Sequence, residues 1–104
     1  MDNFKVIYRI LKAFERSMDQ EEFNTDLITP EQLEISNSRW KKIMKMLSDE
    51  GYLEGVIVIE TNTGDLIVKL KNPAITLKGL EYLNENSFMK KAANIAKGIS
   101  DIIP

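Results

Sequence analysis

Apolar side chains recur at every third or fourth position near the start of the chain, and this spacing predicts a helix over residues 3–17. A stripe this wide is typical of a helix that packs on two sides, so we expect the first helix to lie at the centre of the core. The stripe is expected to consist of Phe4, Ile7, Tyr8, Leu11 and Phe14, widened by Val6, Ile10 and Ala13.

Two further helices are predicted from capping residues and from the same spacing. Thr29 followed by Pro30 is typical of a helix start and indicates a short helix within 29–35. Ser36 is expected to cap the next helix, and Gly51 is expected to end it in the left-handed conformation. The inward positions of this third helix are expected to be Trp40, Ile43, Met44 and Leu47.

A β-hairpin is predicted directly after the third helix. Residues 52–60 and 66–71 are rich in β-branched side chains, and the loop TNTGD at 61–65 lies between them. Two such runs joined by a few residues that include Asn and Gly predict two antiparallel strands. Pro73 is expected to end the second strand, because proline cannot donate a hydrogen bond to a neighbouring strand.

The last part of the chain is expected to form two more helices. Thr76 is the expected cap of a helix over 76–86, in which Gly79 costs about 1 kcal/mol relative to alanine and so indicates a close packing contact. A second helix, within 88–104, has the 3.5-residue spacing of a coiled-coil seam and is expected to pack on the first helix or to form a homodimer. The candidate dimerisation residues are Phe88, Ala92, Ile95, Ile99 and Ile102.

Composition restricts the chemistry that the protein can perform. The chain has a net charge of −2 and contains no cysteine and no histidine. These absences remove disulfides, thiolate nucleophiles, the usual neutral-pH general base and nearly every transition-metal site. The glycines form no phosphate-binding loop, and the acids lack EF-hand spacing. We therefore expect a protein that is not an enzyme and that uses no cofactor and no metal.

Length and hydropathy predict a single domain, residues 1–104, in the cytoplasm. A chain of 104 residues is long enough for one core and too short for two. The longest apolar run, VIVI at 56–59, is far shorter than the roughly 20 residues that cross a membrane. Charges are scattered through the apolar positions of residues 1–16, which is unlike a signal peptide.

The predicted order of elements is that of a winged helix-turn-helix. The fold class is therefore α+β, mainly α, with a three-helix core, a β-hairpin wing and two additional C-terminal helices. The stretch SNSRWKKIMKMLSDEGYLEGV resembles a recognition helix running into a wing, and ITLKGLEYLNEN resembles the helix that follows the wing in many winged-helix regulators. Together they resemble the YjcQ family of small proteins from Gram-positive bacteria and their phages. The resemblance implies a winged-helix fold and adds no biochemical role.

The third helix carries four basic residues and no acid within 36–47. At about 100° per residue, Lys42, Lys45 and Asp49 project away from its apolar face. A recognition helix lies in the major groove of double-stranded DNA, where arginine suits guanine, asparagine suits adenine and lysine suits phosphate. The candidate DNA-binding residues are Asn37, Ser38, Arg39, Lys41, Lys42 and Lys45.

Two observations weigh against DNA binding and leave an alternative open. The sequence pI is about 5.2, and the predicted wing tip carries Glu60 and Asp65 without a basic residue. The alternative is a protein–protein interaction module on the winged-helix scaffold, with the acidic segment 19–34 and the C-terminal helix as contact surfaces. Salt should weaken DNA binding strongly and an apolar interface little. The weaker wing candidates for DNA contact are Asn62, Thr63, Lys69 and Lys71.

Overall fold

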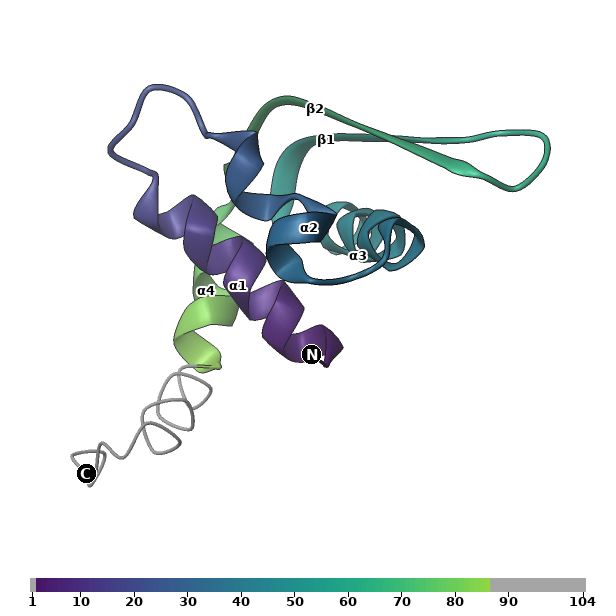
Figure 1. The fold of residues 1–104 in the computed structure, drawn as a ribbon. Helices are drawn as coiled ribbons and strands as arrows, with labels where there is room; N and C mark the ends of the chain where they lie inside the picture. Colours follow the sequence, from purple (N-terminus) through teal and green to yellow (C-terminus); the bar gives the residue numbers. More distant parts are fainter. Residues whose placement is uncertain (1, 87–104) are drawn as a thin grey trace.

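The computed structural model describes residues 2–86, which form four α-helices, a short 3₁₀ helix and a two-stranded antiparallel sheet (Figure 1). This part of the chain is α+β and mainly helical, as the sequence predicts. In chain order the elements are α1 (Asn3–Arg16), η1 (Thr25–Ile28), α2 (Pro30–Leu33), α3 (Asn37–Asp49), β1 (Leu53–Glu60), β2 (Leu66–Ile75) and α4 (Leu77–Glu85). The helix predicted within 88–104, with its candidate dimerisation residues, lies outside the described residues.

Helix α1 is central to the core, as its wide apolar stripe predicts. It contacts α3, α4, η1 and β2, and its buried side chains are Val6, Ile10, Leu11 and Phe14. The expectation that Phe4 belongs to the core is wrong, because its side chain is 62% exposed. It lies in the first turn, before the first buried residue of the helix, so a position on the apolar face does not bury it.

Side chains cap the N-termini of both α2 and α3, and both predicted caps are confirmed. The Thr29 hydroxyl accepts a hydrogen bond from the backbone N–H of Gln32, and the Ser36 hydroxyl accepts one from the N–H of Arg39. The indole of Trp40 donates to the carbonyl oxygen of Ile28 over 2.7 Å. This bond fixes α3 against η1, an element that the sequence did not predict.

Helix α3 ends in a Schellman motif centred on Gly51, as predicted. Gly51 has φ of +77°, and its N–H donates to the carbonyl of Ser48, while the N–H of Tyr52 donates to the carbonyl of Leu47. The chain therefore turns sharply from α3 into β1.

The expectation that Pro73 ends the second strand is wrong, because β2 continues to Ile75. The register shifts between Glu54 and Val56, and the intervening Gly55 has φ of +76°. A side chain at Gly55 would come within 2.9 Å of the Asn72 carbonyl oxygen. The irregular pairing at this bulge lets a proline lie inside the strand, because a bulge leaves a residue out of the regular ladder.

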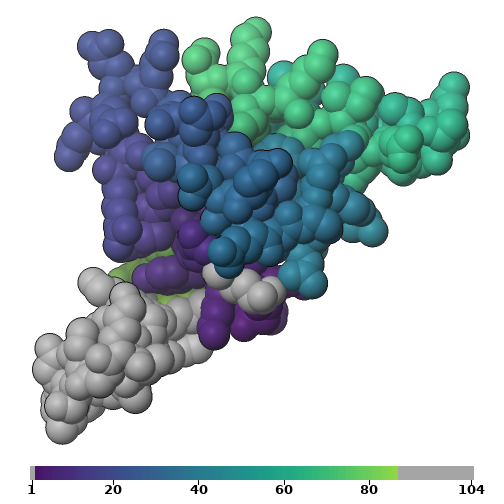
Figure 2. Space-filling model, in the orientation of Figure 1, coloured from purple at the N-terminus to yellow at the C-terminus, as the bar shows by residue number. Residues whose placement is uncertain are grey.

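Thr76 closes the base of the hairpin and starts α4. Its N–H donates to the carbonyl of Tyr52, its hydroxyl donates to the carbonyl of Gly51, and the same hydroxyl accepts from the N–H of Gly79. The predicted cap and the predicted close contact at Gly79 are both confirmed, since an added Cβ there would lie 2.6 Å from Cγ1 of Ile75. The hairpin itself projects from the helices as an arm (Figures 1 and 2).

Candidate nucleic-acid interface

Helix α3 lies with its apolar face toward the core, as its spacing predicts. Ile43, Met44 and Leu47 are buried, and Trp40 is half-buried against the core residues. The opposite side of the helix is therefore turned to solvent. The polar side chains on it belong to two groups with different surroundings, one in each half of the helix.

The N-terminal half of α3 borders a shallow depression of about 360 Å³. Arg39 and Lys42 bring two positive charges to it, and the start of α3 adds the positive end of the helix dipole. The start of α1 forms the other side, and Figure 2 shows this purple segment beside the blue α3. The depression can therefore attract an anionic group. Its lining residues are Asn3, Ser36, Ser38, Arg39, Lys42, Ile43 and Met46.

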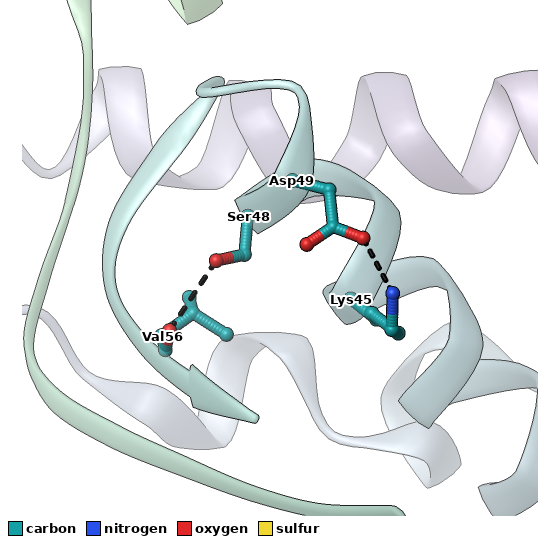
Figure 3. Close-up of polar contacts among 4 residues, drawn as sticks. All are labelled: Lys45, Ser48, Asp49 and Val56. Carbon is teal, nitrogen blue, oxygen red and sulfur yellow. Dashed lines mark hydrogen bonds and ion pairs between the residues drawn. The ribbon is translucent and has the colours of Figure 1, made fainter. Parts of the chain in front are cut away.

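The C-terminal half of α3 is electrostatically different, because its lysine is paired. Lys45 Nζ lies 2.6 Å from a carboxylate oxygen of Asp49, and the two side chains are 43% and 58% exposed (Figure 3). The hydrogen bond to Asp49 raises the pKa of Lys45 above its usual 10.5, and the negative charge of Asp49 raises it further. Partial loss of hydration opposes this shift, and the charge of Glu60 adds the least to it. This end of the helix therefore presents little net positive charge.

The two ends of α3 also differ in how firmly they are attached to the hairpin. The hydroxyl of Ser48 donates to the carbonyl oxygen of Val56 over 3.3 Å, which joins the last turn of α3 to β1 (Figure 3). The exposed residues of the first turn, Asn37 and Ser38, lie at the opposite end of the helix. The basic end of α3 is thus the end farther from this bond to β1.

The tip of the hairpin offers hydroxyl groups and a carboxylate. The hydroxyl of Thr61 accepts from the N–H of Asp65, and the hydroxyl of Thr63 donates to the Asp65 carboxylate over 3.3 Å. Among residues 61–65 there is no basic side chain. A phosphate would therefore meet a negative charge at this tip.

The predicted site residues consequently separate into three places. Ser38, Arg39 and Lys42 line the depression, and Asn37 is exposed at the start of the same helix. Lys41 is half-buried on the flank, and Lys45 is paired with Asp49. None of the four predicted wing residues lines the depression; all four, Asn62, Thr63, Lys69 and Lys71, are exposed on the hairpin.

Four residues that line the depression are not among the predicted DNA-binding residues, and two of these, Ser36 and Ile43, are expected only as a cap and as a core position. Asn3 and Met46 line the depression beside Arg39 and Lys42. Met46 lies at the edge of the apolar face of α3. Spacing alone does not show whether a residue at this edge is buried, and in the structure Met46 is 45% exposed. Asn3 comes from a helix 33 positions earlier than Ser36, so only the packing of α1 beside α3 brings it to the site.

Two other kinds of site have no counterpart in residues 2–86. This segment contains no cluster of three or more acidic, histidine or cysteine residues that could hold a metal ion. It also contains no helix with the length and apolar character that crossing a membrane requires.

Comparisons with known proteins identify a family. No curated protein and no solved structure is significantly similar to the chain. A family model described as YjcQ protein matches residues 8–102, which include every element described above from the second turn of α1 onward. The chain belongs to the YjcQ family.

Proposed function

We propose that the chain is a winged-helix protein without enzymatic activity that binds double-stranded DNA through α3 and acts as a small transcriptional regulator in the cytoplasm. The order of helix, short helix, helix, hairpin and helix supports the winged-helix assignment. The observation that supports DNA binding is the exposed basic surface of the N-terminal half of α3, with Arg39 and Lys42 beside the helix start.

In this proposal the first half of α3 makes the direct contacts. Arg39 reads guanine, Asn37 reads adenine, and Lys42 binds a phosphate oxygen at the edge of the groove. Lys45 contributes after exchanging Asp49 for a phosphate. This exchange costs little free energy, because exposed ion pairs of this kind are weak.

The number of basic residues sets the expected salt dependence. The four basic side chains of α3 neutralise at most four phosphates. This gives a slope of about −3.6 in a plot of the logarithm of the binding constant against the logarithm of the salt concentration. Affinity should therefore fall about 100-fold between 50 and 200 mM salt. The acidic hairpin tip reduces the absolute affinity further, so a monomer is expected to bind random duplex DNA weakly.

The test is a fluorescence titration of random duplex DNA at these two salt concentrations with wild type, Lys42→Glu and Arg16→Glu. Arg16 is exposed at the last position of α1, roughly 20 Å along the helix from Asn3, so it provides the same charge change away from the depression. Lys42→Glu should lower affinity at least tenfold at 50 mM salt, whereas Arg16→Glu should change it about twofold or less. Equal effects of both variants, or wild-type binding that does not respond to salt, would refute the proposal. Thermal midpoints serve as the control for folding.

A second function is favoured by a different surface, the exposed isoleucines on the hairpin. Ile57, Ile59 and Ile67 are each between 43% and 45% exposed, and neighbouring apolar residues exposed to this extent are typical of an interaction surface. A protein–protein interaction module would use this surface, and its binding would persist at high salt. Loss of DNA binding together with salt-resistant capture of a protein partner would favour this second function.

A further inference from the structure

The β1–β2 hairpin has two faces with different surroundings. Residues paired across an antiparallel ladder point to the same side. Val56 pairs with Leu70 and Val58 with Val68, and these valines and Leu70 pack on the core. The residues between them point the other way, and they form what we call the outer face: Ile57, Ile59, Ile67 and Lys69.

The outer face is a continuous apolar strip. Ile59 pairs with Ile67, and Ile57 lies two residues farther along the same strand. All three side chains are more than two-fifths exposed. Threonine also favours β-strands, and at these positions it would expose less apolar surface to water than isoleucine does. The use of isoleucine at three neighbouring positions therefore indicates a surface that another apolar surface covers.

Charges on the two sides of the Ile59–Ile67 pair have opposite signs. Lys69 lies two residues from Ile67 toward the base and pairs with Ile57. Asp65 lies two residues from Ile67 toward the tip, in the loop just before β2, where its carbonyl accepts a hydrogen bond from the N–H of Thr61. Alternation along the hairpin places Asp65 on the same side as Ile67. At 3.3 Å per residue, each charge is about 7 Å from the level of the Ile59–Ile67 pair. Both side chains are exposed. The Ile59–Ile67 pair therefore has a negative charge on its tip side and a positive charge on its base side, at similar distances.

We propose that the outer face packs against the outer face of a second copy of the chain, with the two hairpins antiparallel. A two-fold axis level with the Ile59–Ile67 pair then places Asp65 of each copy beside Lys69 of the other. The parallel arrangement would place Asp65 beside Asp65, and like charges in contact are unfavourable. The charge pattern thus selects a second copy in one orientation, and the contact is isologous.

This contact is independent of the proposed DNA binding. It uses the side of the hairpin opposite to the one that packs on the core, and it involves no residue of α3. Two strands about 4.8 Å apart and roughly 20 Å long offer a small surface, well below the 1,000 Å² or so of a stable interface. The dimer is therefore weak and forms at high protein concentration.

The test is a dilution series of the full chain followed by amide ¹H–¹⁵N spectra, from about 1 mM downward. Dimerisation should shift the amide signals of residues 57–69 and leave those of α3 unchanged. An absence of concentration-dependent shifts, or shifts confined to other residues such as 87–104, would overturn the proposal.

Charge reversals test the orientation. Asp65→Lys and Lys69→Glu should each abolish the concentration-dependent shifts, and the double variant should restore them. The restoration must come from contact between two copies, because the two positions are four residues and about 13 Å apart along the hairpin of one copy. Glu81→Lys, an exposed position on α4, is the control and should leave the shifts unchanged. Failure of the double variant to restore them would exclude the antiparallel arrangement.

Discussion

Replacing Gly79 by alanine is a direct test of how α4 packs on the base of the hairpin. In an isolated helix this substitution is favourable by about 1 kcal/mol, because glycine is a poor helix former. In the folded chain the added Cβ would overlap the carbonyl oxygen of Tyr52 and come 2.6 Å from Cγ1 of Ile75. Propensity and packing therefore predict opposite signs for the change in stability.

The steric overlap at Gly79 is expected to outweigh the gain in helix propensity. Overpacking of this kind typically costs 1–3 kcal/mol, and about 1 kcal/mol more is lost if the Tyr52 carbonyl moves away from the N–H of Thr76. After subtraction of the helix-propensity gain, Gly79→Ala should lower the free energy of unfolding by about 2 kcal/mol. With a urea dependence of 1–2 kcal/mol per M, the midpoint should fall by about 1–2 M.

Urea denaturation followed by circular dichroism measures this change. Asn84→Ala on the exposed side of α4 is the control, and it should raise stability by a few tenths of a kcal/mol through propensity alone. A Gly79→Ala variant that is as stable as wild type, or more stable, would show that α4 does not approach Tyr52 and Ile75 as closely as described.

Two other predictions concern α3. Trp40→Phe removes the indole donor to Ile28 and should lower the free energy of unfolding by about 1–3 kcal/mol in urea denaturation; an unchanged midpoint would mean that this bond is absent in solution. Because Asp49 raises the pKa of Lys45, the pair stabilises the fold below pH 10.5, and this contribution is lost as the pH rises through the pKa of the folded state. Asp49→Asn should return the Lys45 pKa toward 10.5 in an NMR titration of its ¹³Cε signal, and an equal pKa in both proteins would contradict the ion pair.

Helix boundaries could be predicted because they depend on residues close together in the sequence. Thr29, Ser36 and Thr76 each accept a hydrogen bond from the N–H three residues later. The Gly51 turn likewise uses carbonyls within five residues. Local chemistry of this kind is visible in the sequence itself.

The features that could not be predicted depend on residues far apart. Pro73 is accommodated in β2 by a bulge opposite Gly55, and neither residue alone signals the other. Phe4 has the correct spacing for the core, but its burial depends on how far the neighbouring elements extend along α1.

The candidate site could be predicted from the sequence only in part. The outward direction of Lys42 and Lys45 follows from the apolar face of α3, and Asp49 falls on the same side by spacing. The depression beside Asn3 does not follow from spacing, because it depends on the packing of α1 against α3. Which lysine is paired depends on side-chain conformation, and only the structure identifies it as Lys45.

The bonds of Thr76 have a consequence for how the hairpin can vary. They hold the two residues before β1, Gly51 and Tyr52, together with the residue after β2 at a point outside the strand ladder. The hairpin beyond these bonds can therefore gain or lose residues without altering how α3 and α4 begin and end at its base. Shortening or extending the arm is therefore expected to leave the helical part of the molecule folded.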